Sequence, residues 1–173
     1  MKTITIGGGC FWCLEAVYSQ MLGVISAKSG YAGGQIDNPS YDAVCSGSTG
    51  HAEVVQIDYD ENLIGIAQIL EVFWEVHDPT TLNRQGNDIG TQYRSVIYYD
   101  DEEDLEEINT SMKVAQSKFS APIVTEIDEL DIFYVAENYH QNYFRNNPNQ
   151  GYCQVVVSPK VDKFKSLFAD KVK

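Results

Sequence analysis

The chain has 173 residues, 43% apolar and 21% charged, and its 12 basic and 25 acidic residues give a formal net charge of −13. This length fits one domain, so we predict a single domain over residues 1–173, and the apolar content excludes a disordered chain. The negative charge disfavours nucleic acid and anionic membranes as partners. No apolar stretch is long enough to span a bilayer, and the first residues lack the apolar region of a secretory signal, so we expect a cytoplasmic protein.

The predicted elements alternate between strands and helices. Apolar and polar residues alternate over 3–6 and 52–60, and residues 24–31 and 94–99 also have strand character. Helices are predicted over 11–18, from 66 to near 77, over 105–119 and, as a short amphipathic piece, over 161–168. Because the strand at 52–60 has one polar face, we expect helices on only one side of the sheet. The predicted fold is α/β (α+β), a two-layer sandwich with an irregular C-terminal segment.

The most informative segment is the run of three glycines before Cys10, followed by a predicted helix. Glycines allow a sharp turn, and the N-terminus of a helix favours an anion, so we expect the pKa of the Cys10 thiol to be lowered. A lone cysteine there would more often be a small, buried and inert core residue. Cys13 lies one helical turn further on, and a C-x-x-C pair in an α/β chain indicates redox chemistry.

Two other interpretations of this pair remain open. A general thiol–disulfide oxidoreductase would use Cys10 and Cys13 alone. A metal-binding interaction module would need a second pair of ligands, but Cys45, Cys153 and the three histidines have no such spacing, so no metal is expected.

The chain resembles the methionine sulfoxide reductase A family, the peptide-methionine (S)-S-oxide reductases, over nearly its whole length. The segments that carry the resemblance occur in the family's order and include Gly9-Cys10-Phe11-Trp12, Gly30-Tyr31-Ala32-Gly33-Gly34, Asn38-Pro39-Ser40-Tyr41, Thr49-Gly50-His51-Ala52-Glu53, Gly90-Thr91-Gln92-Tyr93-Arg94-Ser95 and Gly151-Tyr152-Cys153. The resemblance implies a two-layer ferredoxin-like plait with additional helices. It also implies reduction of the S epimer of methionine sulfoxide, free or in peptides and proteins, in a protein-repair role.

The resemblance assigns the main chemical roles. Cys10 is the nucleophile, and Phe11 and Trp12 form the apolar pocket for the substrate's methyl group. Glu53 is the acid near the sulfoxide oxygen, provided that burial raises its pKa toward the working pH.

Three further residues complete the implied site. Tyr41 and Tyr93 are hydroxyl donors to the sulfoxide oxygen, in the manner of an oxyanion hole, and Asp88 is a supporting polar group. Without the resemblance, Glu53 would be an exposed edge carboxylate and the tyrosines ordinary packing residues. The histidines are expected to be structural and Cys45 a buried small residue.

The resolving cysteine is less well defined. Attack on the sulfoxide leaves a sulfenic acid on Cys10, which a nearby thiol converts to a disulfide. Cys153 matches the family's C-terminal resolving position, whereas many family members have glycine in place of Cys13. We expect Cys153 to resolve first and Cys13 to form a second disulfide in a relay. Thioredoxin or another dithiol then reduces the disulfide, no cofactor is bound, and a monomer is expected.

Overall fold

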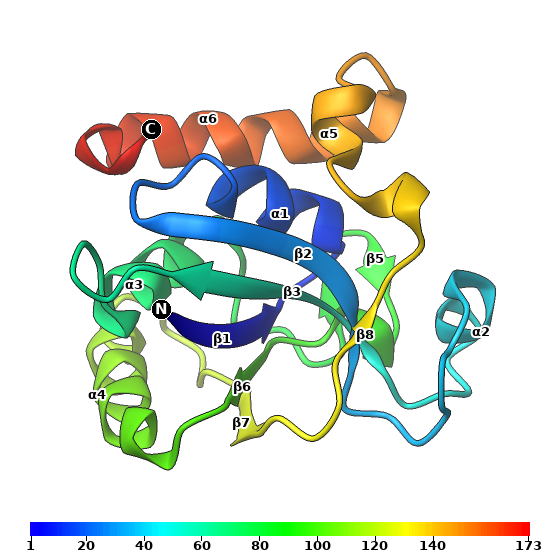
Figure 1. Ribbon diagram of the computed structural model, residues 1–173, viewed down its shortest axis with the longest axis horizontal. Coiled ribbons are helices and arrows are strands. Elements are labelled where there is room, and N and C mark those ends of the chain that lie inside the picture. The colour runs from blue at the N-terminus through cyan, green and yellow to red at the C-terminus, as the bar shows by residue number, and fades with distance from the viewer.

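The computed structural model describes residues 1–173 and is built around a six-stranded sheet (Figure 1). Its strands are β1 (Lys2–Gly7), β2 (Val24–Ala32), β3 (Ala52–Tyr59), β6 (Val96–Tyr99), β7 (Glu126–Glu129) and β8 (Tyr134–Val135). Their spatial order is β7-β6-β1-β3-β2-β8, and every neighbouring pair is antiparallel except the parallel pair β6–β7. A separate hairpin pairs β4 (Arg84–Gln85) with β5 (Asp88–Ile89).

Helices connect and flank these strands. They are α1 (Phe11–Tyr18), α2 (Tyr41–Cys45), α3 (Ile66–Val76), α4 (Leu105–Gln116), α5 (Tyr143–Asn146) and α6 (Ser158–Leu167). Short 3₁₀ turns cover Thr91–Tyr93, Glu102–Asp104, Asn138–His140 and Ala169–Lys171, and a π-helical turn covers Cys153–Val157. None of the helices combines the length and the apolar character that a membrane span requires.

The topology confirms the predicted ferredoxin-like plait. β1 and β2 are connected through α1 with β3 between them, and β3 and β6 are connected through α3 with β1 between them. These two split βαβ units interlock, which places α1 and α3 on the same face of the sheet. The additional helix α6 lies along α1, as Figure 1 shows, and α4 packs against α3.

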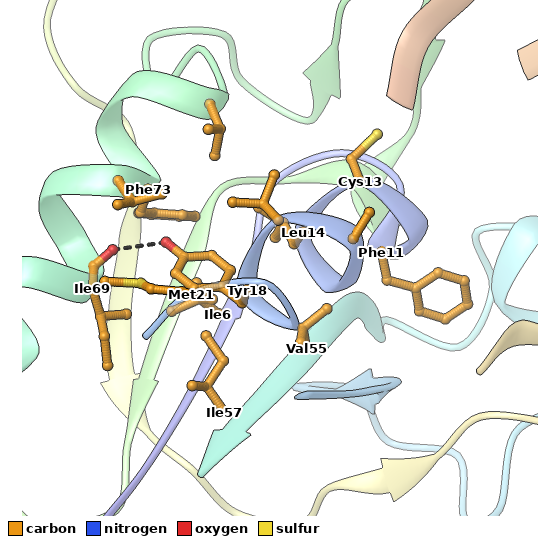
Figure 2. Packing of buried hydrophobic residues seen from close by; sticks show 14 of the residues in the cluster. Ile6, Phe11, Cys13, Leu14, Tyr18, Met21, Val55, Ile57, Ile69 and Phe73 are labelled. Carbon is orange, nitrogen blue, oxygen red and sulfur yellow. Dashed lines mark hydrogen bonds between the residues drawn. The ribbon is translucent and has the colours of Figure 1, made fainter. Parts of the chain in front are cut away.

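One main core lies between the sheet and these helices. On β3, Val55, Ile57 and Tyr59 are buried while Gln56 and Asp58 are only half-buried, which confirms the predicted alternation. Figure 2 shows Val55 and Ile57 facing the side chains of α1, with Tyr18 donating a 2.7 Å hydrogen bond to the carbonyl oxygen of Ile69 on α3. This bond and the surrounding apolar contacts fix α1, and therefore the residues before it, on the sheet.

The opposite face of the sheet carries a small second cluster. It contains Val54, Val96 and Tyr98 with two alanines, and the non-helical residues Leu130 and Phe133 pack against it. The helices therefore lie on one side of the sheet, as the polar face of β3 indicated. The short elements α2, α5, β7 and β8 were not predicted, and α4 ends at Gln116 rather than at residue 119.

Candidate active site

Cys10 lies at the end of a tight glycine turn between β1 and α1. Gly9 has a φ of +82°, and its N–H donates a 3.1 Å hydrogen bond to the carbonyl oxygen of Tyr93. A Cβ atom on Gly8 would lie 2.7 Å from the His77 ring, so these glycines provide both the turn and the space. Cys10 has extended backbone and is the N-cap residue of α1, so the predicted position at the head of a helix is confirmed.

The expectation that this position lowers the pKa of Cys10 is wrong for this structure. Cys10 is only 6% exposed, and burial raises the pKa of its thiol well above the ordinary value. The negative charge of ionised Glu53 adds to the increase, whereas the N–H of Trp12 opposes it. Desolvation of the thiolate therefore outweighs the helix N-terminus, and Cys10 is a neutral thiol before substrate binds.

Glu53 lies on the central strand β3 and is completely buried. Its Oε1 accepts a 3.1 Å hydrogen bond from the N–H of Phe11, and its Oε2 has no partner. Burial raises the pKa of Glu53 to about 8, although the Phe11 N–H acts in the opposite direction. Glu53 is therefore a buried acid next to the first residues of α1 rather than an exposed edge carboxylate.

Tyr41 and Tyr93 approach Glu53 from two different segments. Tyr41 begins α2, and Tyr93 ends the 3₁₀ turn whose carbonyl receives the Gly9 N–H. Burial raises the pKa of both hydroxyls, and the charge of ionised Glu53 is the second cause in each case. Both side chains therefore remain neutral hydroxyl donors near this carboxyl group.

Asp88 lies on β5 and accepts a hydrogen bond from the hydroxyl of Tyr152. Its negative charge also contributes to the raised pKa values of Glu53 and Cys10, which places it near both groups. Asp88 thus has a hydrogen-bond partner, Tyr152, that was not predicted from the sequence.

Phe11 and Trp12 form an aromatic wall with residues of the C-terminal segment. Phe11 is buried, and its ring centroid lies 5.0 Å from that of His140. The Trp12 indole N–H donates a 3.0 Å hydrogen bond to His140 Nδ1, and Tyr143 stacks on Trp12 at a centroid distance of 3.7 Å and an interplanar angle of 6°. The edge of Tyr152 also contacts Trp12. These four contacts join α1 to residues 140–152.

The other cysteines differ from one another in burial. Cys13 and Cys153 are both buried in the main core, and Cys45 is exposed, which corrects the expectation that Cys45 is a buried packing residue. Burial raises the pKa of Cys13 to about 11, while the ammonium group of Lys160 opposes this increase. All four thiols are free, and no group of three or more histidine, cysteine and carboxylate side chains is placed to hold a metal ion.

Sequence reasoning missed the contribution of the C-terminal segment. His140 is a structural acceptor, as expected, but Tyr143 and Tyr152 were not assigned to the site. The sequence signals were the density of aromatic residues over 139–144 and the family segment Gly151-Tyr152-Cys153, and neither indicates what these aromatic residues contact. Their placement depends on how residues 138–157 fold back onto α1.

Comparison with known proteins shows the family of this chain. The family model described as "Peptide methionine sulfoxide reductase" matches residues 2–172. The chain belongs to this family. It is 57% identical to the peptide methionine sulfoxide reductase MsrA of Leptospira borgpetersenii over 164 residues, which cover 95% of the chain and 93% of the relative.

Solved structures of this family share the fold. The reduced form of Mxr1 from Saccharomyces cerevisiae matches with a TM-score of 0.84 and 39% identity, and the match covers 88% of each chain. Mxr1 in complex with Trx2 matches with a TM-score of 0.59 and 28% identity, over 82% of this chain and 84% of that one.

Proposed function

We propose that this chain reduces the S epimer of methionine sulfoxide, free or in peptides and proteins, with Cys10 as nucleophile and a thioredoxin-type dithiol as final reductant. Membership of the peptide methionine sulfoxide reductase family carries the reaction and its reductant. The observation that carries the site is Glu53, a completely buried carboxyl group beside the Cys10 turn with an unpartnered oxygen. A sulfoxide reductase needs this proton donor, whereas a thiol–disulfide oxidoreductase does not.

The first half-reaction transfers an oxygen atom between two sulfur atoms. The Cys10 sulfur attacks the sulfoxide sulfur, the S–O bond of the sulfoxide breaks, and the protonated oxygen becomes bonded to the Cys10 sulfur. The products are methionine and the sulfenic acid of Cys10. The substrate sulfur is reduced by two electrons and the Cys10 sulfur is oxidised by two. Phe11 and Trp12 hold the methyl group, while the Tyr41 and Tyr93 hydroxyls stabilise the charge that develops on the oxygen.

Glu53 handles the proton in this step. At neutral pH both Glu53 and Cys10 are protonated, because burial raises the pKa of each group. Glu53 gives its proton to the sulfoxide oxygen as the new bond forms and takes the proton that Cys10 loses. A thiol and a sulfoxide thus become a sulfenic acid and a thioether with no net uptake of protons from solvent.

Cys153 resolves the sulfenic acid in this proposal. Its thiol forms a disulfide with Cys10 and releases one water molecule. Cys13, which lies one helical turn from Cys10, then exchanges into this disulfide as a relay. Cys13 is also near Cys153, because a negative charge on Cys153 raises the pKa of Cys13. An external dithiol, of the thioredoxin type, restores the three thiols by exchange. We further propose that the enzyme works as a monomer in the cytoplasm.

Glu53→Gln tests the assignment of the site. Single-turnover reduction of each epimer of methionine sulfoxide, followed without external thiol, should consume only the S epimer in the wild type and slow by about 10²- to 10⁴-fold in the variant. Glu129→Gln, an exposed glutamate on β7, is the matched control and should keep the wild-type rate. Consumption of neither epimer by the wild type would contradict the proposal, as would an unchanged rate in Glu53→Gln.

The order of the cysteines is tested separately. After oxidation of the Cys13→Ser variant by one equivalent of substrate, peptide mapping should find a Cys10–Cys153 disulfide. If that disulfide is missing and turnover collapses, the resolving role belongs to Cys13.

A further inference from the structure

Glu15 is a second buried carboxylate near the site, and the proposed mechanism does not use it. It lies on α1, one turn after Phe11 and Trp12, and is only 3% exposed. None of the ion pairs in the structure includes it. Acidic side chains are rarely buried without a cation, because desolvation of the charge is costly. The position of this carboxylate therefore requires an explanation.

The two oxygens of Glu15 both face the backbone of the C-terminal segment. Oε2 and Oε1 accept the N–H of Asn142 at 2.8 and 3.0 Å, and the N–H of Tyr143 is also directed at this carboxylate. Asn142 has a φ of +55°, in the left-handed region, so the chain changes direction at this point. Hydrogen bonds to a carboxylate are stronger than those to a neutral acceptor. Burial raises the pKa of Glu15 to about 7, so these bonds are strongest above that pH. The carboxylate thus fixes a backbone reversal at Asn142, a residue type that tolerates the left-handed conformation.

Two contacts of Trp12 hold the same segment to α1. The ring of Tyr143, the residue directly after the anchored Asn142, stacks on Trp12 at 3.7 Å, and the Trp12 indole N–H bonds His140. Glu15 and Trp12 project from the same short helix, and the Phe11 ring of that helix also lies 5.0 Å from the His140 ring, so the segment meets α1 at several points. Next to the carboxylate is a cavity of about 370 Å³, which Arg145 also lines without forming an ion pair with Glu15. Gln141 ties the same segment to β2, because its amide oxygen accepts the N–H of Ser29 at 3.0 Å and its amide N–H donates to the Ser29 carbonyl oxygen at 2.9 Å. Glu15 is therefore the anchor of the part directly before Tyr143.

We propose that Glu15 is a positioning residue of the reductase, whose carboxylate holds residues 138–146 against α1 so that Tyr143 stays stacked on Trp12 at the substrate pocket. Glu15 does not touch the substrate in this account, and it acts through the backbone of Asn142 and Tyr143. The inference rests on the proposed function, because Trp12 is assigned there to the pocket for the methyl group. Loss of the anchor should therefore weaken substrate binding more than it slows the chemical step.

The experiment compares Glu15→Ala and Glu15→Gln in single-turnover reduction of the S epimer without external thiol. Glu15→Ala removes both acceptors, and we expect the half-saturating substrate concentration to rise about tenfold while the maximal rate stays within about threefold. Glu15→Gln keeps one acceptor oxygen at nearly the same size and should show a smaller rise. Glu71→Ala, an exposed glutamate on α3, is the control and should leave both quantities unchanged.

A spectroscopic measurement separates positioning from general folding and does not depend on turnover. The chain has two tryptophans, so a Trp74→Phe background reports Trp12 alone. In that background Glu15→Ala should shift the emission of Trp12 to longer wavelength, as Tyr143 leaves the ring and water reaches it, and Glu15→Gln should shift it less. If Glu15→Ala does not fold, the isosteric Glu15→Gln variant still provides both readings.

Two results would overturn the inference. The first is a folded Glu15→Ala variant whose half-saturating substrate concentration and Trp12 emission equal those of the wild type. If Glu15→Ala does not fold, the same result in Glu15→Gln overturns the inference. The other is a fall in maximal rate and melting temperature with no change in half-saturation or emission, which is the pattern of a purely structural residue. If the wild type itself reduces no sulfoxide, the proposed function fails, while the emission measurement still decides whether Glu15 holds the segment.

Discussion

At Cys10, two influences on the acidity of the thiol act in opposite directions. The N-cap position on α1 favours a thiolate, whereas nearly complete burial favours the thiol, and burial has the larger effect. The consequence is a site in which Glu53, with a pKa of about 8, loses its proton before Cys10 does as the pH rises. The proton needed by the sulfoxide oxygen is therefore available at neutral pH.

The pH dependence of the first half-reaction follows from this order. The single-turnover rate of sulfenic acid formation should be nearly constant below pH 7 and should fall through a midpoint near pH 8, because Glu53 is then ionised and no longer gives a proton. Stopped-flow measurement between pH 5.5 and 9.5 determines the profile. Glu53→Gln should be slow at every pH and should lack this midpoint. A wild-type rate that rises through pH 8 would contradict the role of Glu53 as the acid.

The positions of some site residues were predictable from the sequence, and those of others were not. The position of Cys10 was predictable, because three glycines before an apolar run indicate a turn into a helix. The burial of Glu53 was not, because the same alternation suits an edge strand, and only the place of β3 between β1 and β2 encloses the carboxyl group. Tyr152 was missed for a related reason, since its contacts with Trp12 and Asp88 join segments 64 or more residues apart.

At the scale of elements, the position of α1 depends on the glycine turn that precedes it. A Cβ atom on Gly9 would lie 2.8 Å from Cγ of Gln85. Gln85 cannot easily move, because its side-chain amide donates to the carbonyl oxygen of Asp78 at 2.9 Å and its amide oxygen accepts the Asp78 N–H at 2.8 Å. The turn that presents Cys10 is thus fixed by the β4 residue against which it packs.

Gly9→Ala should therefore destabilise the protein and misplace Cys10. Gly47→Ala is the matched control, since Gly47 also has a positive φ, +78°, but has no atom within 4 Å of an added Cβ. Both variants bear the cost of the left-handed backbone, and Gly9→Ala should lose about 1–3 kcal/mol more in the free energy of unfolding, measured with urea. Its single-turnover rate should also fall, while that of Gly47→Ala should not. Equal losses in the two variants would show that packing against Gln85 is unimportant.

Which elements were predicted depends on how they are stabilised. β3 follows its periodicity over Val55 to Tyr59, and α3 follows its own throughout, because each buries one continuous face there. α5 and β8 have four and two residues, too few for a periodic signal, and they exist because of distant partners. β8 pairs with β2, and α5 is held by Glu15 and Trp12 on α1. The predictable part of the fold is thus the plait, and the unpredicted part is the segment that completes the site.

For the molecule as a whole, the strong negative charge of the surface contrasts with an interior that favours neutral groups. Burial raises the pKa of Glu53 to about 8 and that of Glu15 to about 7, and lowers the pKa of His77 to about 4. Each shift disfavours the charged form, as expected for desolvation. Because the pKa values of these two carboxyl groups are raised, they make the fold less stable as the pH rises. An ordinary ion-paired carboxylate has the opposite effect.

The sign of this coupling leads to a prediction for Glu53. Its folded pKa is higher than its unfolded value near 4.5, so between pH 5 and 8 the unfolded chain releases a proton that the folded protein keeps, and stability falls as the pH rises. The wild type should lose free energy of unfolding relative to Glu53→Gln by up to about 1.4 kcal/mol for each pH unit in this window. Urea unfolding at pH 5, 6.5 and 8 measures the free energy of unfolding of the wild type minus that of Glu53→Gln, and this quantity should fall at each step in pH.

Glu129→Gln provides the control for the surface charge. It also removes one negative charge, but its stability relative to the wild type should not change over the same pH window, because Glu129 is exposed on the edge strand β7. Repeating the series at high salt screens the repulsion among the exposed carboxylates and should leave the Glu53 difference in place, since buried groups are screened much less. A difference that disappears with salt, or that is equal for the two variants, would assign the pH dependence to the net charge of −13 rather than to the buried acid.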